Sequence, residues 1–138
     1  MKTVAIIVGV NHWKDITSPF CWSLREFNPE LELIIVDNAS SPPYPTDFPG
    51  GTTVRSHERL GYNRALNLGM AVAGDADWLI CFNNDCKCNG PLAPILQLLS
   101  PSVLYGSGEN YDKVNGLMLQ WSAWLVISRP ILEAVGKF

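Results

Sequence analysis

The stretch Trp78-Leu79-Ile80-Cys81-Phe82-Asn83-Asn84-Asp85 is an apolar run that stops abruptly at two amides and a carboxylate. It is short and is entered from the polar turn 74–77, which predicts a strand covered on both faces in the centre of a mostly parallel sheet. Ligands of open α/β sheets collect at the carboxyl ends of such strands. Asn83, Asn84 and Asp85 therefore stand where a ligand is expected, although the same residue types after a strand also make plain turns.

Strand and helix patterns alternate along the rest of the chain. We expect a buried strand over 4–10 and further strands over 31–36, 52–56, 103–105 and 123–127. We expect helices over 18–27, 62–73 and 130–135, and one that carries the apolar stripe Leu92, Ile95, Leu96 and Leu99. The proline-rich segment 41–51 and the polar segment 106–115 are predicted to be loops. This alternation is typical of the α/β class, with a mostly parallel central sheet flanked by helices on both faces.

The composition suits a single domain over residues 1–138. The net charge of −3 argues against a nucleic-acid partner, and no apolar stretch approaches the roughly 18 residues needed to span a bilayer. The first residues run directly into a strand and do not resemble a signal peptide. Cys86-Lys87-Cys88 has a spacing unsuited to zinc or a disulfide, so we interpret the cysteines as thiols of a cytoplasmic protein.

Three of the predicted strands end in polar residues, namely Asn11, Asp37-Asn38 and Asn83-Asn84-Asp85. Parallel strands would bring these ends to one edge of the sheet. Gly9 would let a ligand approach the backbone closely. Asp37 would accept a hydrogen bond from a base or a ribose, unless it makes only a local turn into the proline-rich loop.

The segment from Arg59 to Asn67 adds positive charge beside the start of a predicted helix. Helix N-termini favour anions, so Arg59 and Arg64 indicate a phosphate-bearing ligand. Asn63 and Asn67 are four residues apart and share one helix face. The alternative is that both arginines are solvated and both amides bond to neighbouring loops.

Taken together in this order, the motifs resemble the family 2 nucleotide-sugar glycosyltransferases of the GT-A fold. The resemblance covers essentially the whole chain and rests on the following segments: Val10-Asn11, Val36-Asp37-Asn38-Ala39-Ser40, Arg59-Leu60-Gly61-Tyr62-Asn63, Asn67-Leu68-Gly69, Phe82-Asn83-Asn84-Asp85, Ala123 to Arg129 and Val135-Gly136. It implies a Rossmann-like fold and transfer of a sugar from a nucleotide-diphospho-sugar, with a UDP-sugar as the expected donor, to an unknown acceptor.

The resemblance also implies roles for individual residues. The base and ribose would lie beside Val10, Asn11 and Asp37, and the rest of the nucleotide beside Arg59, Gly61, Asn63, Asn67, Asn83 and Asn84. Asn83-Asn84-Asp85 occupies the place of the family's Asp-x-Asp motif, so Asp85 would bind Mn²⁺ or Mg²⁺. A divalent cation stabilises the charge that develops on a departing nucleoside diphosphate, and it takes only one or two carboxylates from the protein. Asn83 keeps an oxygen but lacks the charge of the family's first aspartate.

The chain departs from the family at its catalytic base, which lies in a segment beyond the match to Val135-Gly136. Glu109 and Asp112 are the nearest acidic candidates, although loop acids are more often solvated surface groups. His12 and His57 are weak substitutes for the family's metal-binding histidine. Trp121 and Trp124 flank the start of the last predicted strand, where one would stack on a sugar while the other packs in the core.

Two other functions fit parts of the sequence. One is a module that binds a nucleotide or sugar without turnover, or the donor-binding half of a longer transferase. A dinucleotide-dependent Rossmann enzyme is disfavoured, because no Gly-x-Gly-x-x-Gly turn follows the first strand. The sugar, the acceptor, the stereochemical outcome and the oligomeric state are left open by the sequence.

Overall fold

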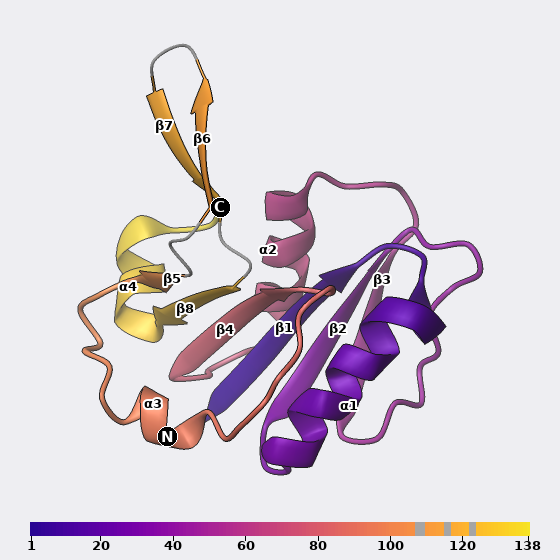
Figure 1. Ribbon diagram of the computed structural model, residues 1–138, viewed down its shortest axis with the longest axis horizontal. Helices are drawn as coiled ribbons and strands as arrows, with labels where there is room; N and C mark the ends of the chain where they lie inside the picture. The colour runs from indigo at the N-terminus through magenta and orange to yellow at the C-terminus, as the bar shows by residue number, and fades with distance from the viewer. Residues whose placement is uncertain (107–109, 115–116, 122–123) are drawn as a thin grey trace.

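The computed structural model describes the backbone of residues 1–106, 110–114, 117–121 and 124–138, and the side chains of 1–106 and 124–138. Its main sheet has six strands in the order β3, β2, β1, β4, β8, β5 (Figure 1). Their bounds are β1 Thr3–Gly9, β2 Glu32–Asn38, β3 Gly51–Ser56, β4 Trp78–Asn83, β5 Tyr105–Gly106 and β8 Trp124–Ser128. The first four strands of this order are parallel, whereas β8 is antiparallel to both β4 and β5. The predicted α/β class with a mostly parallel sheet is confirmed.

Helices cover both faces of this sheet. α1 (Ser18–Phe27) lies on one face and α2 (Tyr62–Val72) on the other, while α3 (Ala93–Leu96) and α4 (Arg129–Val135) flank β8 (Figure 1). Neighbouring residues of a strand point to opposite faces, so Ala5 and Ile7 of β1 pack with the α1 side and Val4 and Ile6 with the α2 side. Two apolar cores therefore sandwich the buried central strands.

α2 packs directly against the sheet at Gly69. A Cβ atom at this position would come within 2.5 Å of Cγ2 of Ile6 and within 2.9 Å of Cγ2 of Val36. Both methyl groups belong to buried β-branched side chains that have little freedom to move. Gly69 thus sets how closely α2 approaches β1 and β2.

Two local predictions were wrong, and one element had not been predicted. The expected helix with the stripe from Leu92 to Leu99 is α-helical only over α3 and continues as two tighter turns, in which Leu98 and Leu99 donate to the carbonyls of Ile95 and Leu96. The predicted loop 106–115 contains β6 (Asn110–Val114), which pairs with β7 (Leu117–Trp121) in a separate two-stranded sheet. A π-helical turn η1 (Trp13–Thr17) precedes α1 and was not expected.

Two further features concern membrane-spanning helices and the cysteines. In the part of the chain that the structure describes, no helix has the length and apolar character needed to cross a bilayer. All four cysteines are free thiols, as the sequence predicted.

Candidate active site

The carboxyl ends of β1, β2 and β4 meet at one edge of the sheet, as the sequence predicted. In the registers of the parallel pairs, Gly9 lies beside Asp37 and Val8 beside Asn83. These strand ends and the start of α2 enclose a polar pocket of about 350 Å³, which we call the tip pocket. Its lining residues are Val8, Gly9, Val10, Asn38, Arg59, Leu60, Tyr62, Asn83, Asn84 and Asp85.

Asp85 and Arg59 are the charged side chains that line the tip pocket. Both are exposed, and among the described residues neither makes a hydrogen bond or ion pair. Asn83, the last residue of β4, is half-buried and adds an amide to the same wall. Within the described residues, the pocket therefore presents one unpaired carboxylate, one unpaired cation and an amide.

The N-terminus of α2 opens onto the tip pocket. Gly61 is its N-cap residue, and no side chain caps the first turn. Helix amides left without a cap favour an anion. Tyr62, which sequence reasoning had not singled out as a site residue, lines the same wall. Burial, with a smaller effect from the nearby Cys81 and Cys86, raises the pKa of Tyr62 to about 12.

Asn38 fixes the loop that leads into α2. Its side-chain amide donates to the carbonyl of Leu60 at 2.9 Å and its oxygen accepts from the Leu60 N–H at 2.8 Å. This pairing holds the neighbouring Arg59 and Gly61 against the end of β2. Its position directly after Asp37 in a strand end is the signal that identified Asn38 as part of the polar edge.

Asp37 is buried and its carboxylate is directed at the proline-rich loop instead of the tip pocket. One oxygen accepts from the Ser40 N–H at 2.9 Å, and the other accepts from the Tyr44 N–H at 3.0 Å and pairs with Arg55. Burial alone would raise the pKa of Asp37, but the hydrogen bonds from Ser40 and Tyr44 and the Arg55 guanidinium outweigh it and hold the pKa below its ordinary value. This is the local-turn alternative considered for Asp37, strengthened by an ion pair.

A chain of hydrogen bonds links the end of β4 to the end of β1. Asn84 donates to the Thr17 hydroxyl at 2.9 Å, this hydroxyl lies 2.9 Å from the Tyr44 hydroxyl, and Tyr44 donates to the Asn11 carbonyl at 2.6 Å. A Cβ atom on Gly9 would lie 2.4 Å from the Tyr44 hydroxyl oxygen. The space that we expected Gly9 to leave for a ligand is thus taken by Tyr44, although the Gly9 backbone still lines the tip pocket.

Several predicted site residues lie apart from the tip pocket. Asn11 adopts a positive φ of 52° and its side chain accepts from the Ser41 N–H at 2.8 Å. Asn63 is exposed in the first turn of α2 and is not among the lining residues. Asn67 exchanges hydrogen bonds with the backbone of Phe138. Trp124 lies on the α1 face of the sheet, where it lines a different pocket.

The remaining candidates are Glu109, Asp112, Trp121 and the two histidines. Glu109 falls outside the described residues, and Asp112 and Trp121 lie in β6 and β7, whose side chains are not described. Trp121 and Trp124 belong to different strands, so the expectation that both stand on one strand was wrong. Of the two histidines, His12 faces Asp15 at 3.4 Å and His57 is exposed at the end of β3.

Within the described part of the chain, no group of three or more histidine, cysteine or acidic side chains is placed to hold a metal ion. A site that binds the cation together with a nucleotide needs fewer protein ligands, because Mg²⁺ and its analogues take one or two carboxylates and complete their shell with phosphate and water. Asp85 lies beside the Asn83 amide and has no hydrogen-bond or ion-pair partner among the described residues, so it fits that arrangement.

Comparison with known proteins gives similarity at the level of structure. No protein-family model matches the sequence, and no curated protein sequence matches it either. The mannosyltransferase PcManGT from Pyrobaculum calidifontis, solved with GDP-Man and Mn²⁺, is similar over 99% of this chain and 47% of its own, with 16% identity and a TM-score of 0.73.

Two further structures are similar. GalNAc-T7, solved with UDP, GalNAc and Mn²⁺, matches 99% of this chain and 36% of its own with 15% identity and a TM-score of 0.72. Glucosyl-3-phosphoglycerate synthase from Mycobacterium tuberculosis, solved with UDP, matches 95% of this chain and 58% of its own with 16% identity and a TM-score of 0.61. This chain thus spans between about a third and three fifths of their length. The expected architecture is confirmed: the chain has the fold of the GT-A glycosyltransferases.

Proposed function

We propose that this protein is a metal-dependent glycosyltransferase that moves a sugar from a nucleotide-diphospho-sugar, with a UDP-sugar as the first candidate, to an acceptor. The observation that carries the proposal is the tip pocket itself, where the unpaired Asp85 carboxylate, the Arg59 guanidinium and the uncapped start of α2 share one cavity. A pyrophosphate with a divalent cation satisfies all of these groups at once. A neutral ligand would leave both charges without partners.

Each group has a separate role in this proposal. Asp85 holds Mn²⁺ or Mg²⁺ with help from the Asn83 oxygen, and the bound ion would stabilise charge on the departing diphosphate. Arg59 and the first amides of α2 orient the phosphates, and the Tyr62 hydroxyl donates to an oxygen of the donor. In the transfer, an acceptor oxygen bonds to the anomeric carbon while the bond from that carbon to the phosphate oxygen breaks, and the acceptor proton is released. Glu109 and Asp112 remain our candidates for the base that takes this proton.

Titration calorimetry with UDP, GDP and dTDP, each with and without Mn²⁺, tests the proposed site and identifies the nucleobase that the site prefers. We expect binding that requires Mn²⁺ and is tightest for UDP. Absence of binding for every nucleotide in the presence of Mn²⁺ would refute the proposal.

Replacing Asp85 by alanine should lower Mn²⁺-dependent hydrolysis or transfer of the donor by on the order of 100-fold or more, because a metal ion contributes several kcal/mol to such a transition state. Asp75→Ala is the matched control, since this exposed carboxylate lies before β4, at the opposite end of the strand. Equal activity of the two variants would count against Asp85 as the metal ligand.

The second candidate is a nucleotide-binding module without turnover, or the donor-binding half of a longer transferase. It is favoured by the part of the solved transferases that this chain spans. Release of labelled sugar from a donor panel would exclude it. Nucleotide binding without release of sugar against a broad acceptor panel would support it.

We further propose that residues 1–138 form one domain. From the four free thiols, we also propose that the protein functions in the cytoplasm.

A further inference from the structure

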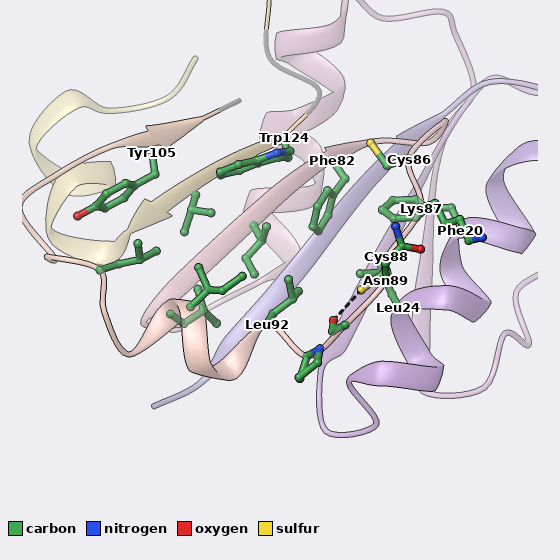
Figure 2. A pocket seen from close by; sticks show the side chains of 17 residues that line it. Phe20, Leu24, Phe82, Cys86, Lys87, Cys88, Asn89, Leu92, Tyr105 and Trp124 are labelled. Carbon is green, nitrogen blue, oxygen red and sulfur yellow. Dashed lines mark hydrogen bonds between the residues drawn. The ribbon is translucent and has the colours of Figure 1, made fainter. Parts of the chain in front are cut away.

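A second pocket lies on the α1 face of the sheet and differs from the tip pocket in chemistry. It has a volume of about 370 Å³, within the range of about 300–1,000 Å³ typical of small-molecule sites. We call it the apolar pocket. Phe82 of β4, Trp124 and Val126 of β8, and Leu96 of α3 contribute to its wall, and Figure 2 shows aromatic side chains from separate elements arranged around it.

The lining of the apolar pocket is almost free of charge. Lys87 is the one charged side chain among the described residues that line it. The segment 89–106, which supplies α3 and much of the outer wall, contains no charged residue at all. Polar or ionic ligands would lose their hydration here without gaining partners, whereas a hydrocarbon would not.

The apolar pocket and the tip pocket are lined by neighbouring residues at the end of β4. Phe82 and Cys86 line the apolar pocket, while Asn83, Asn84 and Asp85, which lie between them in the chain, line the tip pocket. A molecule seated against Phe82 and Cys86 therefore needs to pass only the end of β4 to reach the groups proposed to hold the donor. Trp124 stands opposite Phe82 in the antiparallel pair, lines the apolar pocket and is 37% exposed, so part of the pocket wall at the end of β4 is open to solvent.

We propose that the apolar pocket binds the hydrocarbon chain of the acceptor, and that the acceptor is an amphiphile whose hydroxyl emerges at the end of β4 beside Asp85. This inference rests on the proposed function, which supplies the donor and the reaction. It adds the class of acceptor, a single-chain amphiphile, which the tip pocket by itself does not indicate.

Calorimetric titration of the whole chain with 1-hexanol, 1-octanol and 1-decanol tests the pocket without any donor. Affinity should rise about fourfold for each added methylene until the pocket is full, and the heat capacity change on binding should be negative. Affinity that does not depend on chain length, or no binding by any of the alcohols, would overturn the inference.

A matched pair of variants separates the pocket from the apolar surface beside it. Ile95 lines the pocket and is 56% exposed, whereas Leu98 lies three residues further on, is 85% exposed and does not line it. Ile95→Asp should weaken decanol binding more than about tenfold by placing a carboxylate at the rim, whereas Leu98→Asp should stay within about twofold of the unmodified protein. Equal losses in both variants would assign the binding to the outer surface and overturn the inference.

A second substitution at the same position keeps the test independent of charge. Ile95→Trp narrows the pocket, so affinity should stop rising at a shorter alcohol than in the unmodified protein. If affinity stopped rising at the same alcohol length as in the unmodified protein, binding within the pocket would be contradicted. Circular dichroism and thermal unfolding of each variant confirm that it is folded before its binding is compared.

The acceptor role is tested by incubating the protein with Mn²⁺, a panel of UDP- and GDP-sugars and 1-octanol, with mass spectrometry of the products. An octyl glycoside that is lost in Ile95→Asp and retained in Leu98→Asp supports the inference. Binding of UDP and Mn²⁺ with no alcohol binding would overturn the acceptor assignment and leave the proposed function intact. Alcohol binding without any nucleotide binding would refute the proposed function, and the acceptor assignment would fall with it.

Discussion

Each oxygen of the Asp37 carboxylate has a partner within the chain, so this residue stabilises the loop after β2. The sequence was sufficient to place Asp37 at the end of a buried strand. It was not sufficient to identify its partners, because Tyr44 belongs to an irregular loop and Arg55 becomes a neighbour only through the β2–β3 register. Arg55 thus stabilises the same loop through Asp37; sequence reasoning missed it, because a lone arginine in a short strand was its only signal.

Replacing Asp37 by asparagine should make stability less sensitive to acid. Because the pKa of Asp37 is lowered in the folded state, its ionised form contributes stability above the unfolded pKa of about 4, and this contribution is lost as pH falls through the folded pKa. We expect Asp37→Asn to cost about 3 kcal/mol at pH 7, since Arg55 loses its partner. The cost should shrink below about pH 4. Urea unfolding at several pH values measures the stability lost at neutral and at acid pH. A loss of stability that stays constant with pH would contradict the role of the ionised Asp37 in stabilising the fold.

Ala39 adopts a positive φ of 59° without being glycine. This left-handed conformation costs an L-residue about 1–2 kcal/mol, and glycine adopts it without penalty but loses more entropy on folding. Ala39→Gly should therefore raise the free energy of unfolding by about 0.5 kcal/mol. Ala71→Gly, at an exposed position of α2, is the control and should instead lower it by about 1 kcal/mol. Thermal unfolding of both variants provides the comparison.

Elements that carry a strong pattern were predicted well, and elements that depend on their neighbours were not. α1 and α2 follow from an N-terminal Ser18-Pro19 and from a long apolar face, and their bounds agree with the structure within about a residue. The apolar stripe from Leu92 to Leu99 misled us, because Pro94 lies in the first turn of α3 and the residues after Leu96 form tighter turns that keep the stripe without regular α-helix. The β6–β7 pair was missed although Asn115-Gly116 is a strong hairpin dipeptide in the sequence.

The distance between α2 and the sheet gives a prediction at the scale of elements. Gly69→Ala improves helix propensity, but the added methyl group would press on Ile6 and Val36. Overpacking of a buried contact costs about 1–3 kcal/mol, so we expect a net loss of stability of about 1 kcal/mol or more. Gly90→Ala is the control, since a Cβ atom there has no neighbour within 4 Å. Equal denaturation midpoints for the two variants would mean that α2 is not held as tightly as the contact indicates.

At the scale of the whole molecule, a ligand held between the strand ends and α2 should stabilise the fold. Free ligand at about a hundred times its dissociation constant adds about 2.7 kcal/mol, which corresponds to a rise in Tm of roughly 8 °C for a chain of this size. We expect this rise with UDP and Mn²⁺ together. It should be smaller in Arg59→Ser at the same ligand concentrations and unchanged in Lys137→Ser, an exposed cation distant in the chain from Arg59. Differential scanning calorimetry measures the shift, and an Arg59→Ser variant that keeps the full rise would exclude Arg59 from the phosphate site.

The position of β1 between β2 and β4 also determines when this protein can fold. β1 pairs with β4 from Thr3 beside Trp78 to Val8 beside Asn83, so one edge of the first strand has no partner until β4 has been synthesised. An unpaired apolar strand edge is a template for association between chains, and parallel pairing across such a separation is slow. A nascent chain that stalls before residue 78 should therefore aggregate or recruit a chaperone, and the outer edge of β4 stays exposed in the same way until β8 has been synthesised.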